Sequence, residues 1–265
     1  MKKILIAMAM VTTLAAGVRA QAPAGSGTNT PPSTAAIPAA SAGTAAAPTA
    51  VLTKDEPHHH LVLENAYVRV LHVEVPGHDA TLLHTHDLPY ASVTLGAADF
   101  VNAVTGKQEA HATLKDAQVG YSKGGFSHIA RTDAGVPFRN FTVELLKPQG
   151  AARNLCVKVV ADAPVQDCPA AAADANVPVF ETDEMRVESG SLAAQGKRAE
   201  AASDSPRLYL VLEQSELTIA IPGLGDKTLH TGEVFWLPGG AAPALANPGA
   251  GVSRFLVLTF KDGGK

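Results

Sequence analysis

The fold is decided by the segment Gly77-His-Asp-Ala-Thr-Leu-Leu-His84-Thr-His86-Asp-Leu-Pro-Tyr90-Ala-Ser-Val-Thr-Leu-Gly96. Successive side chains of a β-strand alternate between its two faces, so a strand here points His84 and His86 the same way. Pro76-Gly77 predicts a turn before it, and Tyr90–Leu95 carries β-branched residues typical of a strand. Two imidazoles on one strand face can chelate a metal ion, and a third from elsewhere would complete a site.

A later segment offers that third imidazole. Gly124-Gly-Phe-Ser-His128 follows a turn-rich stretch, and residues 138–146 are predicted to form a closing strand. The order of the two segments resembles the two motifs of the cupin family. The first motif is a glycine, His-x-His, usually a glutamate, and a glycine, and the second is a glycine, proline and glycine leading to a third histidine. His84 and His86 match the first motif, and Gly125 and His128 match the second.

This sequence departs from the cupin pattern in three places. Tyr90 stands near the usual place of the glutamate, and Ala117 and Lys123 replace the early glycine and the proline of the second motif. Without the glutamate, three neutral ligands leave the charge of a divalent cation uncompensated. An anionic substrate or hydroxide would then be favoured at the open positions.

The resemblance implies a divalent transition metal (Fe, Mn, Ni, Cu or Zn) bound by His84, His86 and His128. Neutral imidazole suits these ions, and three ligands leave positions open for water or substrate. The alternative is that the three histidines are polar residues of a barrel mouth that bind nothing. Tyr90 continues the even-numbered strand face and is the candidate catalytic residue, with a core aromatic role as the alternative.

The remaining titratable residues are predicted to lie outside the site. Glu144 is interpreted as a solvent-facing charge rather than a replacement acid. The triplet His58-His59-His60 follows Asp55-Glu56 and is interpreted as a solvated approach to the first domain. The isolated histidines are expected to be structural or exposed: His72, His78, His111 and His230.

An internal repeat supports the resemblance. Aligning Gly77 with Gly196 without a gap sets Ser203 and Ser205 against the two motif histidines, and Tyr209 against Tyr90. Further on, Pro243 stands where the third histidine belongs. Hydroxyls are poor neutral ligands and proline has no side-chain donor, so the second copy is predicted to bind no transition metal.

Short predicted strands separated by turns every eight to twelve residues or so indicate an all-β fold. The cupin resemblance narrows it to two tandem jelly rolls, that is, a bicupin. The predicted organisation is a metal-binding cupin domain at 51–160, a linker at 161–176 and a degenerate cupin domain at 177–265. Cupins often associate through their outer sheets, so a homodimer is a further expectation.

The first twenty residues predict a secretory signal peptide. Lys2 and Lys3 precede an apolar run too short to span a bilayer comfortably, and small residues allow cleavage after Ala20 or Ala22. Residues 21–50 are almost all Ala, Pro, Ser, Thr and Gly, and are predicted to form a flexible linker. The expected location is periplasmic or secreted.

Charge and cysteine content narrow the partners. Cleavage would remove three of the 21 basic residues and leave 18 against 25 acidic ones, a net charge near −7 that disfavours nucleic acid. No basic amphipathic or second long apolar stretch predicts membrane insertion of the mature chain. Cys156 and Cys168 are predicted to form a structural disulfide in an oxidising compartment, with a reactive or metal-binding thiol as the alternative.

The resemblance implies a metal-dependent oxidoreductase of the dioxygenase type, or an isomerase, acting on a small molecule. The sequence shows no Ser-His-Asp series and no phosphate loop, so catalysis would depend on the metal. The first alternative is a non-enzymatic periplasmic protein that binds a small molecule or metal, which the missing glutamate and the degenerate second half favour. A second is a structural protein with a vestigial metal site.

Overall fold

The computed structural model describes residues 49–166, 168 and 176–261. The predicted signal peptide and nearly all of the segment 21–50 lie outside these residues, as does most of the C-terminal half of the expected linker. The described residues all belong to one compact unit. No helix in the described part of the chain is long and apolar enough to cross a membrane.

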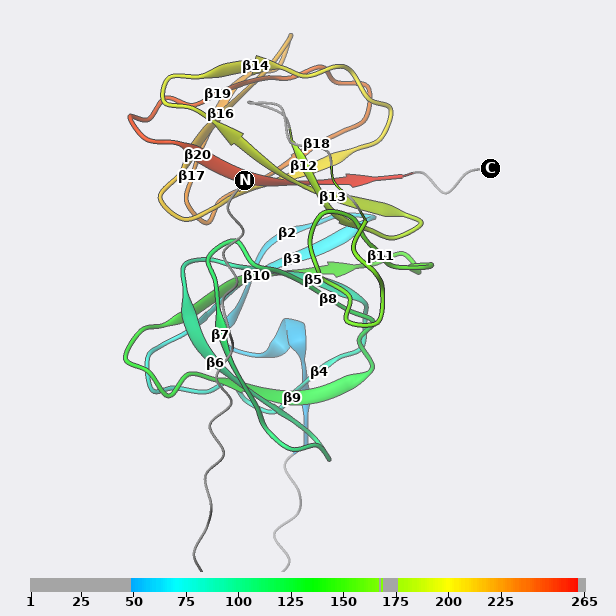
Figure 1. The fold of residues 1–265 in the computed structure, drawn as a ribbon, viewed down its shortest axis with the longest axis vertical. Coiled ribbons are helices and arrows are strands. Elements are labelled where there is room, and N and C mark those ends of the chain that lie inside the picture. The colour runs from blue at the N-terminus through cyan, green and yellow to red at the C-terminus, as the bar shows by residue number, and fades with distance from the viewer. Residues whose placement is uncertain (1–48, 167, 169–175, 262–265) are drawn as a thin grey trace, which may run out of the picture. The chain divides into compact units, whose positions relative to one another are not determined.

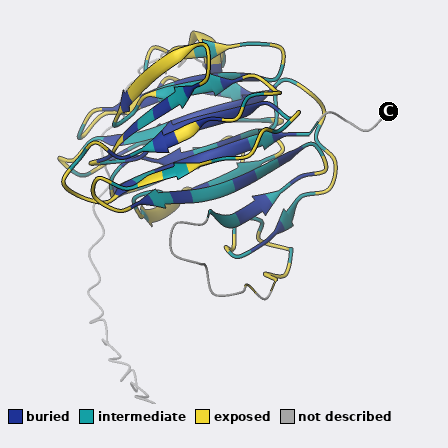
Figure 2. Ribbon diagram, turned by 90° about the horizontal axis from the view of Figure 1, so that it is seen from above, coloured by how far each residue is buried: buried dark blue, intermediate teal, exposed yellow. Residues whose placement is uncertain are grey.

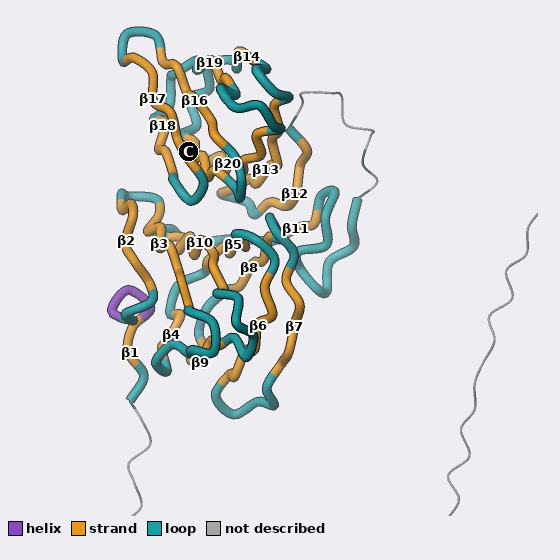
Figure 3. Tube along the Cα trace, turned by 90° about the vertical axis from the view of Figure 1, so that its left-hand side faces the viewer, coloured by secondary structure: helices purple, strands orange, loops and turns teal. Residues whose placement is uncertain are grey.

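The first half of this unit is a barrel of two five-stranded sheets (Figure 1). One sheet contains, in spatial order, β2 (His59–Glu64), β3 (Val68–Val75), β10 (Phe138–Leu145), β5 (Tyr90–Thr94) and β8 (Val119–Ser122). The other contains β1 (Val51–Leu52), β4 (His84–His86), β9 (Phe126–Arg131), β6 (Ala98–Val104) and β7 (Ala110–Leu114). The short 3-10 helix η1 (Thr53–Asp55) follows β1 and is the only helix among the described residues (Figure 3).

The second half repeats this architecture. Its larger sheet contains β11 (Arg153–Asn154), β12 (Val177–Glu181), β13 (Met185–Leu192), β20 (Ser253–Phe260), β15 (Arg207–Val211) and β18 (Val234–Leu237). Its smaller sheet contains β14 (Lys197–Ala199), β19 (Ala244–Ala246), β16 (Glu216–Ile221) and β17 (Gly225–His230).

The strand orders show that the two halves are structural repeats. The order β2-β3-β10-β5-β8 of the first half recurs as β12-β13-β20-β15-β18, and β4-β9-β6-β7 recurs as β14-β19-β16-β17. The prediction of an all-β chain built from two jelly rolls is therefore confirmed.

One hydrophobic core joins the larger sheets of both barrels. Alternate side chains of β3, β5 and β10 point outward from the first barrel. They pack against the outward-pointing side chains of β13, β15 and β20 in the second barrel. Figure 2 shows that buried positions recur along the strands, between intermediate and exposed ones. Members with no exposed surface include Val68, Val70, Phe141, Val143, Phe180, Met185 and Leu208. Full burial of such side chains contributes about 1.5–3 kcal/mol each, which makes the two barrels one stable body.

The register of the repeats differs from the ungapped sequence alignment. The β10–β3 and β20–β13 ladders each run eight pairs without a shift, so Glu144 and Thr259 occupy the same position. Glu144 pairs with Tyr90 of β5, and Thr259 pairs with Arg207 of β15. The counterpart of Tyr90 is therefore Arg207, and the predicted match with Tyr209 is wrong by two residues.

The same shift displaces the counterparts of the motif histidines. β14 occupies the position in the second barrel that β4 has in the first. Ser203 and Ser205 lie in the loop after β14, so they are not the structural counterparts of His84 and His86. β19 takes the place of β9, and Pro243 precedes it. Neither β14 nor β19 contains a histidine, so the second barrel lacks the imidazole set whichever alignment is used.

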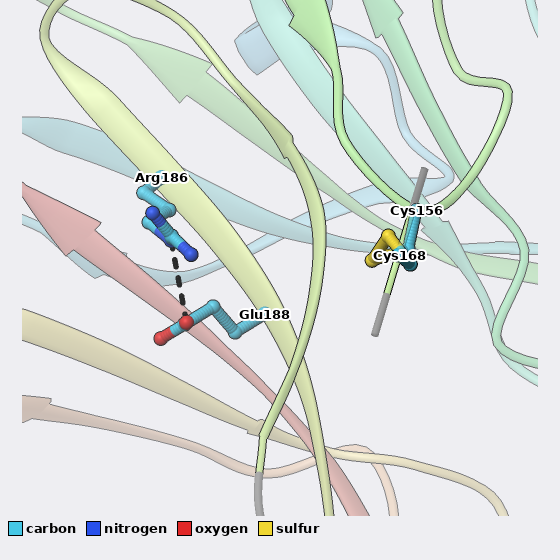
Figure 4. The surroundings of a disulfide bond; sticks show 4 residues. All are labelled: Cys156, Cys168, Arg186 and Glu188. Carbon is cyan, nitrogen blue, oxygen red and sulfur yellow. Dashed lines mark hydrogen bonds and ion pairs between the residues drawn. A yellow bond between two sulfur atoms is a disulfide. The ribbon is translucent and has the colours of Figure 1, made fainter. Parts of the chain in front are cut away.

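The connection between the barrels begins earlier than the expected linker. Arg153–Asn154 of β11 pairs with β12 and so belongs to the larger sheet of the second barrel. The buried Asn154 side chain holds the loop that follows, because its Nδ2 donates to the carbonyls of Val160 and Ala163. Cys156 and Cys168 form a disulfide with a Cα–Cα distance of 5.4 Å. Figure 4 shows this disulfide together with the Arg186–Glu188 ion pair on β13.

Candidate metal centre

Two neighbouring strands bring the three motif histidines together. β4 and β9 pair antiparallel, with His84 directly opposite His128 and His86 opposite Phe126. The Nε2 atom of His128 lies 3.0 Å from that of His84 and 3.1 Å from that of His86. The outward pair of the same ladder, Thr85 and Ser127, is joined by a hydroxyl hydrogen bond of 2.7 Å, which fixes the register.

The hydrogen bonds of the outer ring nitrogens define the tautomers. His84 Nδ1 donates to the carbonyl oxygen of Leu82 at 2.9 Å, and a carbonyl can only accept. His128 Nδ1 donates to Asn102 Oδ1 on β6 at 2.7 Å. Both Nε2 atoms therefore carry lone pairs that face each other.

Burial keeps the three rings neutral. Loss of hydration is the main cause that lowers the pKa of His84 to about 4, of His86 to about 2 and of His128 to about 3, and the neighbouring imidazoles contribute to the low values of the last two. Neutral imidazole is the form that binds a metal ion.

The nitrogens fit a metal ion. Lone pairs about 3 Å apart with no proton between them repel each other, and a cation among them removes the repulsion. Metal–nitrogen bonds of about 2.1 Å at right angles place neighbouring ligand atoms about 3.0 Å apart. His86 Nδ1 is also buried without a hydrogen-bond partner, so either tautomer of this ring leaves a nitrogen unsatisfied unless a further group binds.

A fourth histidine, His59 of β2, lies beside the three. It is 7% exposed, and its ring centroid is 4.8 Å from that of His84 and 6.2 Å from that of His86. One ring nitrogen of each of these three residues lies within 4.8 Å of the others, a geometry that could hold a metal ion. The prediction of a solvated approach is therefore wrong for His59, although His60 is exposed.

Glu56 anchors His59. Its buried carboxylate accepts hydrogen bonds from His59 Nδ1 at 2.6 Å, from His58 Nδ1 at 3.0 Å and from the amide of Leu82 at 3.1 Å. Burial alone would raise the pKa of Glu56, but hydrogen bonds from His59, His58 and a backbone amide lower it to about 2. Glu56 is thus a buried anion one imidazole away from the histidine cluster.

Tyr90 lies against the cluster. Its ring stacks on His86 with a centroid distance of 4.3 Å and an interplanar angle of 26°. Burial raises the pKa of Tyr90 to about 12, against the opposing effect of a hydrogen bond with Ser122. The phenol stays protonated, so it can donate a hydrogen bond but cannot act as a base near neutral pH.

The histidines form one wall of a cavity of about 260 Å³ inside the first barrel. Hydroxyl and amide groups from β5, β8 and β10 form much of the remaining wall, together with a few apolar side chains. Among the residues that the structure describes, those lining the cavity include no Lys, Arg, Asp or Glu. The polar lining comprises Tyr90, Ser92, Thr94, Asn102, Gln118, Tyr121, Ser122, Asn140 and Thr142.

Glu144 does not face solvent, contrary to the sequence-based prediction. It is 1% exposed and accepts a hydrogen bond from Arg69 Nη1 at 2.8 Å. Burial raises the pKa of Glu144, and the Arg69 guanidinium opposes this effect. Of the isolated histidines, His78, His111 and His230 are exposed, whereas His72 is half-buried against Phe141.

Sequence reasoning missed the pair Glu56 and His59. No motif contains them, and they become part of the site only because β2 pairs with β3 and sets His59 opposite Val73. The one signal in the sequence is a carboxylate three residues before a histidine, a spacing too common to indicate a site by itself.

No family model matches this sequence, and no curated protein matches it. Solved structures are similar in fold. AerE from Microcystis aeruginosa has a TM-score of 0.55 at 10% identity, covering 78% of this chain and 99% of that chain. A mutant salicylate 1,2-dioxygenase from Pseudoaminobacter salicylatoxidans has a TM-score of 0.53 at 10% identity, covering 74% of this chain and 72% of that chain. Vicilin from Solanum melongena has a TM-score of 0.55 at 11% identity, covering 73% of this chain and 74% of that chain.

These similar structures are cupins, so the comparison confirms the bicupin fold expected from the motifs. At these identities the likeness concerns the fold. The salicylate 1,2-dioxygenase mutant in complex with gentisate is also similar, with a TM-score of 0.52 at 10% identity, covering 74% of this chain and 69% of that chain.

Proposed function

We propose that the first barrel binds a divalent transition metal through His84, His86 and His128 and acts on a small molecule as an oxidoreductase of the dioxygenase type. The observation that carries this proposal is the convergence of the three Nε2 atoms, with that of His128 3.0–3.1 Å from the other two, at the wall of a polar cavity. A bound ion would supply a Lewis-acidic or redox-active centre with open positions for a substrate oxygen or dioxygen.

The residues of the chain position and select the substrate. Leu82 and Asn102 hold the rings of His84 and His128 through their Nδ1 atoms, so the ligands are preorganised. The hydroxyl of Tyr90 and the side chains of Ser92 and Asn140 offer hydrogen bonds to a substrate beside the ion. His84, His86 and His128 are buried, so a substrate bound against them would lose contact with water, which would strengthen each of these interactions.

The cavity narrows the class of substrate. A volume of about 260 Å³ accommodates a small molecule such as a hydroxylated aromatic acid. No cationic side chain lines the cavity, so an anionic group on the substrate would have only the metal ion to balance its charge. Gentisate, which occupies a solved structure of the similar dioxygenase, has this combination of size, hydroxyl groups and one carboxylate.

The alternative is a binding protein without turnover. One observation favours it: His84, His86 and His128 are neutral imidazoles and Tyr90 has a pKa of about 12, so none of these four groups is suited to be a general acid or base near neutral pH. Catalysis would then depend on the metal ion alone.

Metal analysis followed by oxygen measurements tests the proposal. The purified chain, stripped with a chelator and reloaded with Fe(II), Mn(II), Ni(II), Cu(II) or Zn(II), should bind one ion per chain, and His128→Ala should not. Oxygen uptake with gentisate, salicylate, a thiol or a diketone would support the enzyme. Ligand binding without oxygen uptake or product would support the binding protein. A chain that stays metal-free would contradict the enzyme, and one that also binds none of these small molecules would contradict both functions and leave a structural protein with a vestigial metal site.

We also propose that the protein is exported. The basic start and short apolar run of residues 1–20 support this, as does the Cys156–Cys168 disulfide, which is typical of oxidising compartments. Fractionation of cells that express the full chain, with N-terminal sequencing of the product, tests it. A product that keeps its N-terminus and stays in the cytoplasm would contradict export.

A further inference from the structure

We propose that His59 is a fourth nitrogen ligand of the metal ion in the first barrel, and that Glu56 is the positioning residue that aims it. This inference rests on the proposed function, because it assumes that His84, His86 and His128 hold an ion. It adds a ligand from β2, a strand outside both of the sequence segments that carry the other three histidines.

The first argument is placement. β2 pairs with β3 so that His59 lies opposite Val73, and both residues line the cavity beside the other histidines. A ring nitrogen of His59 is within 4.8 Å of one in His84 and one in His86. Opposite ligands of a six-coordinate ion are about 4.2 Å apart, so a small inward movement of the His59 ring would bring it to the same ion.

The second argument is the tautomer. His59 Nδ1 donates to Glu56 Oε2 at 2.6 Å, because a carboxylate with several donors around it can only accept. In the neutral ring the opposite nitrogen, Nε2, therefore carries the lone pair. His84 and His128 show the same arrangement, with Nδ1 tied to a fixed oxygen and Nε2 left to bind. A metal-binding histidine almost always has its second nitrogen held in this way.

The third argument is charge. The Glu56 side chain is fully buried, and its hydrogen-bond partners among the described residues are two imidazoles and the backbone amides of His58 and Leu82. None of these partners is an arginine or a lysine. A buried carboxylate that is hydrogen-bonded to no permanently charged cation is costly. A divalent ion on the far side of the His59 ring balances it, and Glu56 in turn supplies the negative charge that three neutral ligands lack.

The segment that carries Glu56 is itself fixed to the site. β1 pairs in parallel with β4, with Val51 opposite His84. Thr53 Oγ1 donates to the carbonyl of Thr85 at 2.8 Å, between the two motif histidines. The turn from η1 to β2 is thus built against the strand of the primary ligands, which keeps Glu56 and His59 in place.

Metal titrations of matched variants test the proposal. In a chelator competition, Glu56→Gln should weaken binding of Cu(II) or Co(II) by about 10- to 100-fold, and His59→Ala by at least as much. His60→Ala is the matched control, because His60 follows His59 in β2, is exposed and points to the opposite face of the strand. Its affinity should equal that of the wild type. Circular dichroism of the metal-free variants checks that they fold.

Electron paramagnetic resonance of the Cu(II)-loaded chain provides a readout independent of activity and of variant stability. The wild type should show four coordinating imidazole nitrogens, and His59→Ala three. Three nitrogens in the wild type, or unchanged affinity and spectrum in folded His59→Ala, would overturn this inference and leave the proposed function intact. If the wild type binds no ion, or if His128→Ala binds as well as the wild type, the proposed function itself fails.

Discussion

Asn140 in the first barrel and Phe255 in the second occupy the same ladder position, and the difference between them separates a site from a filled core. Asn140 pairs with Val73 and lines the cavity, whereas Phe255 pairs with Gly190 and is fully buried. A Cβ on Gly190 would collide with the Phe255 ring, so the glycine makes the room that this ring fills.

The neighbouring ladder shows the same contrast. Ser92 pairs with Gly120 in the first barrel, and their counterparts Tyr209 and Phe235 pair in the second. Two of the smallest side chains thus correspond to two of the largest. The apolar interior of the second barrel is closed by Leu192, Val211, Leu217, Ile219, Leu229, Leu237, Leu245 and Val257.

The two barrels also differ in which groups pair with their interior carboxylates. In the second barrel the carboxylate of Glu200 is satisfied by Arg207 at 2.8 Å and by the Tyr209 hydroxyl at 2.6 Å. In the first barrel the hydrogen-bond partners of the Glu56 carboxylate, within the described part of the chain, are imidazoles and backbone amides. The same fold therefore forms a second barrel with a filled apolar interior and a first barrel with a polar cavity. One shared hydrophobic core joins the two barrels.

The largest contrast is expected in metal binding. Replacing His128 with Ala removes the nitrogen that lies about 3 Å from both of the others, so stoichiometric metal should be lost from the whole chain. His230→Ala, in the second barrel and exposed, should keep one ion per chain. Elemental analysis of both proteins after dialysis measures the difference. Equal metal content would mean that the ion binds elsewhere.

Stability should show the opposite contrast. Phe255→Ala should lower the free energy of unfolding by about 3–5 kcal/mol, because it leaves a cavity in a close-packed interior. Asn140→Ala, at the matching ladder position, should cost less than about 1 kcal/mol because its side chain borders an existing cavity. Urea denaturation followed by circular dichroism compares them. Similar losses for both variants would contradict the contrast between a filled and an open barrel.

The sequence predicted the fold and the three motif histidines because both depend on local patterns. Alternation within a strand puts His84 and His86 on one face, and turn residues mark strand ends throughout the chain. The convergence with His128 required only that β4 and β9 be neighbours, which the cupin resemblance supplied.

Features that depend on long-range register could not be predicted. His59 and Glu56 join the site through the pairing of β2 with β3, and no local pattern specifies that pairing. The burial of Glu144 depends likewise on Arg69 lying opposite it on β3. The ungapped repeat alignment failed because the repeats differ in loop length. It matched Tyr90 with Tyr209, whereas the strand pairing matches Tyr90 with Arg207, two residues earlier.

The disulfide should stabilise the unit without affecting either interior. Replacing both Cys156 and Cys168 with Ser should lower the free energy of unfolding by about 3 kcal/mol on the chain-entropy model, since the bridge closes a loop of short sequence separation, 12 residues. Metal content should stay that of the wild type, because neither cysteine lines the cavity. Urea denaturation with and without a reductant measures the effect. A loss of metal in the double variant would show that the bridge shapes the first barrel.

The smallest expected effects distinguish two tyrosines that the sequence alignment equated. Tyr209→Phe removes a hydrogen bond to the partly buried Glu200 carboxylate and should cost about 1.5–3 kcal/mol of stability. Tyr90→Phe should change stability by less than about 1 kcal/mol, because its hydroxyl lies at the cavity with Ser122 as partner. The Tyr90 variant should instead weaken binding of gentisate to the metal-loaded chain by up to about tenfold, the equivalent of one hydrogen bond. Calorimetric titration measures that affinity, and the Tyr209 variant should bind as the wild type does. If Tyr90→Phe keeps full gentisate affinity and metal content, the phenol has no role at the site, and Tyr90 is only the aromatic wall on which His86 stacks.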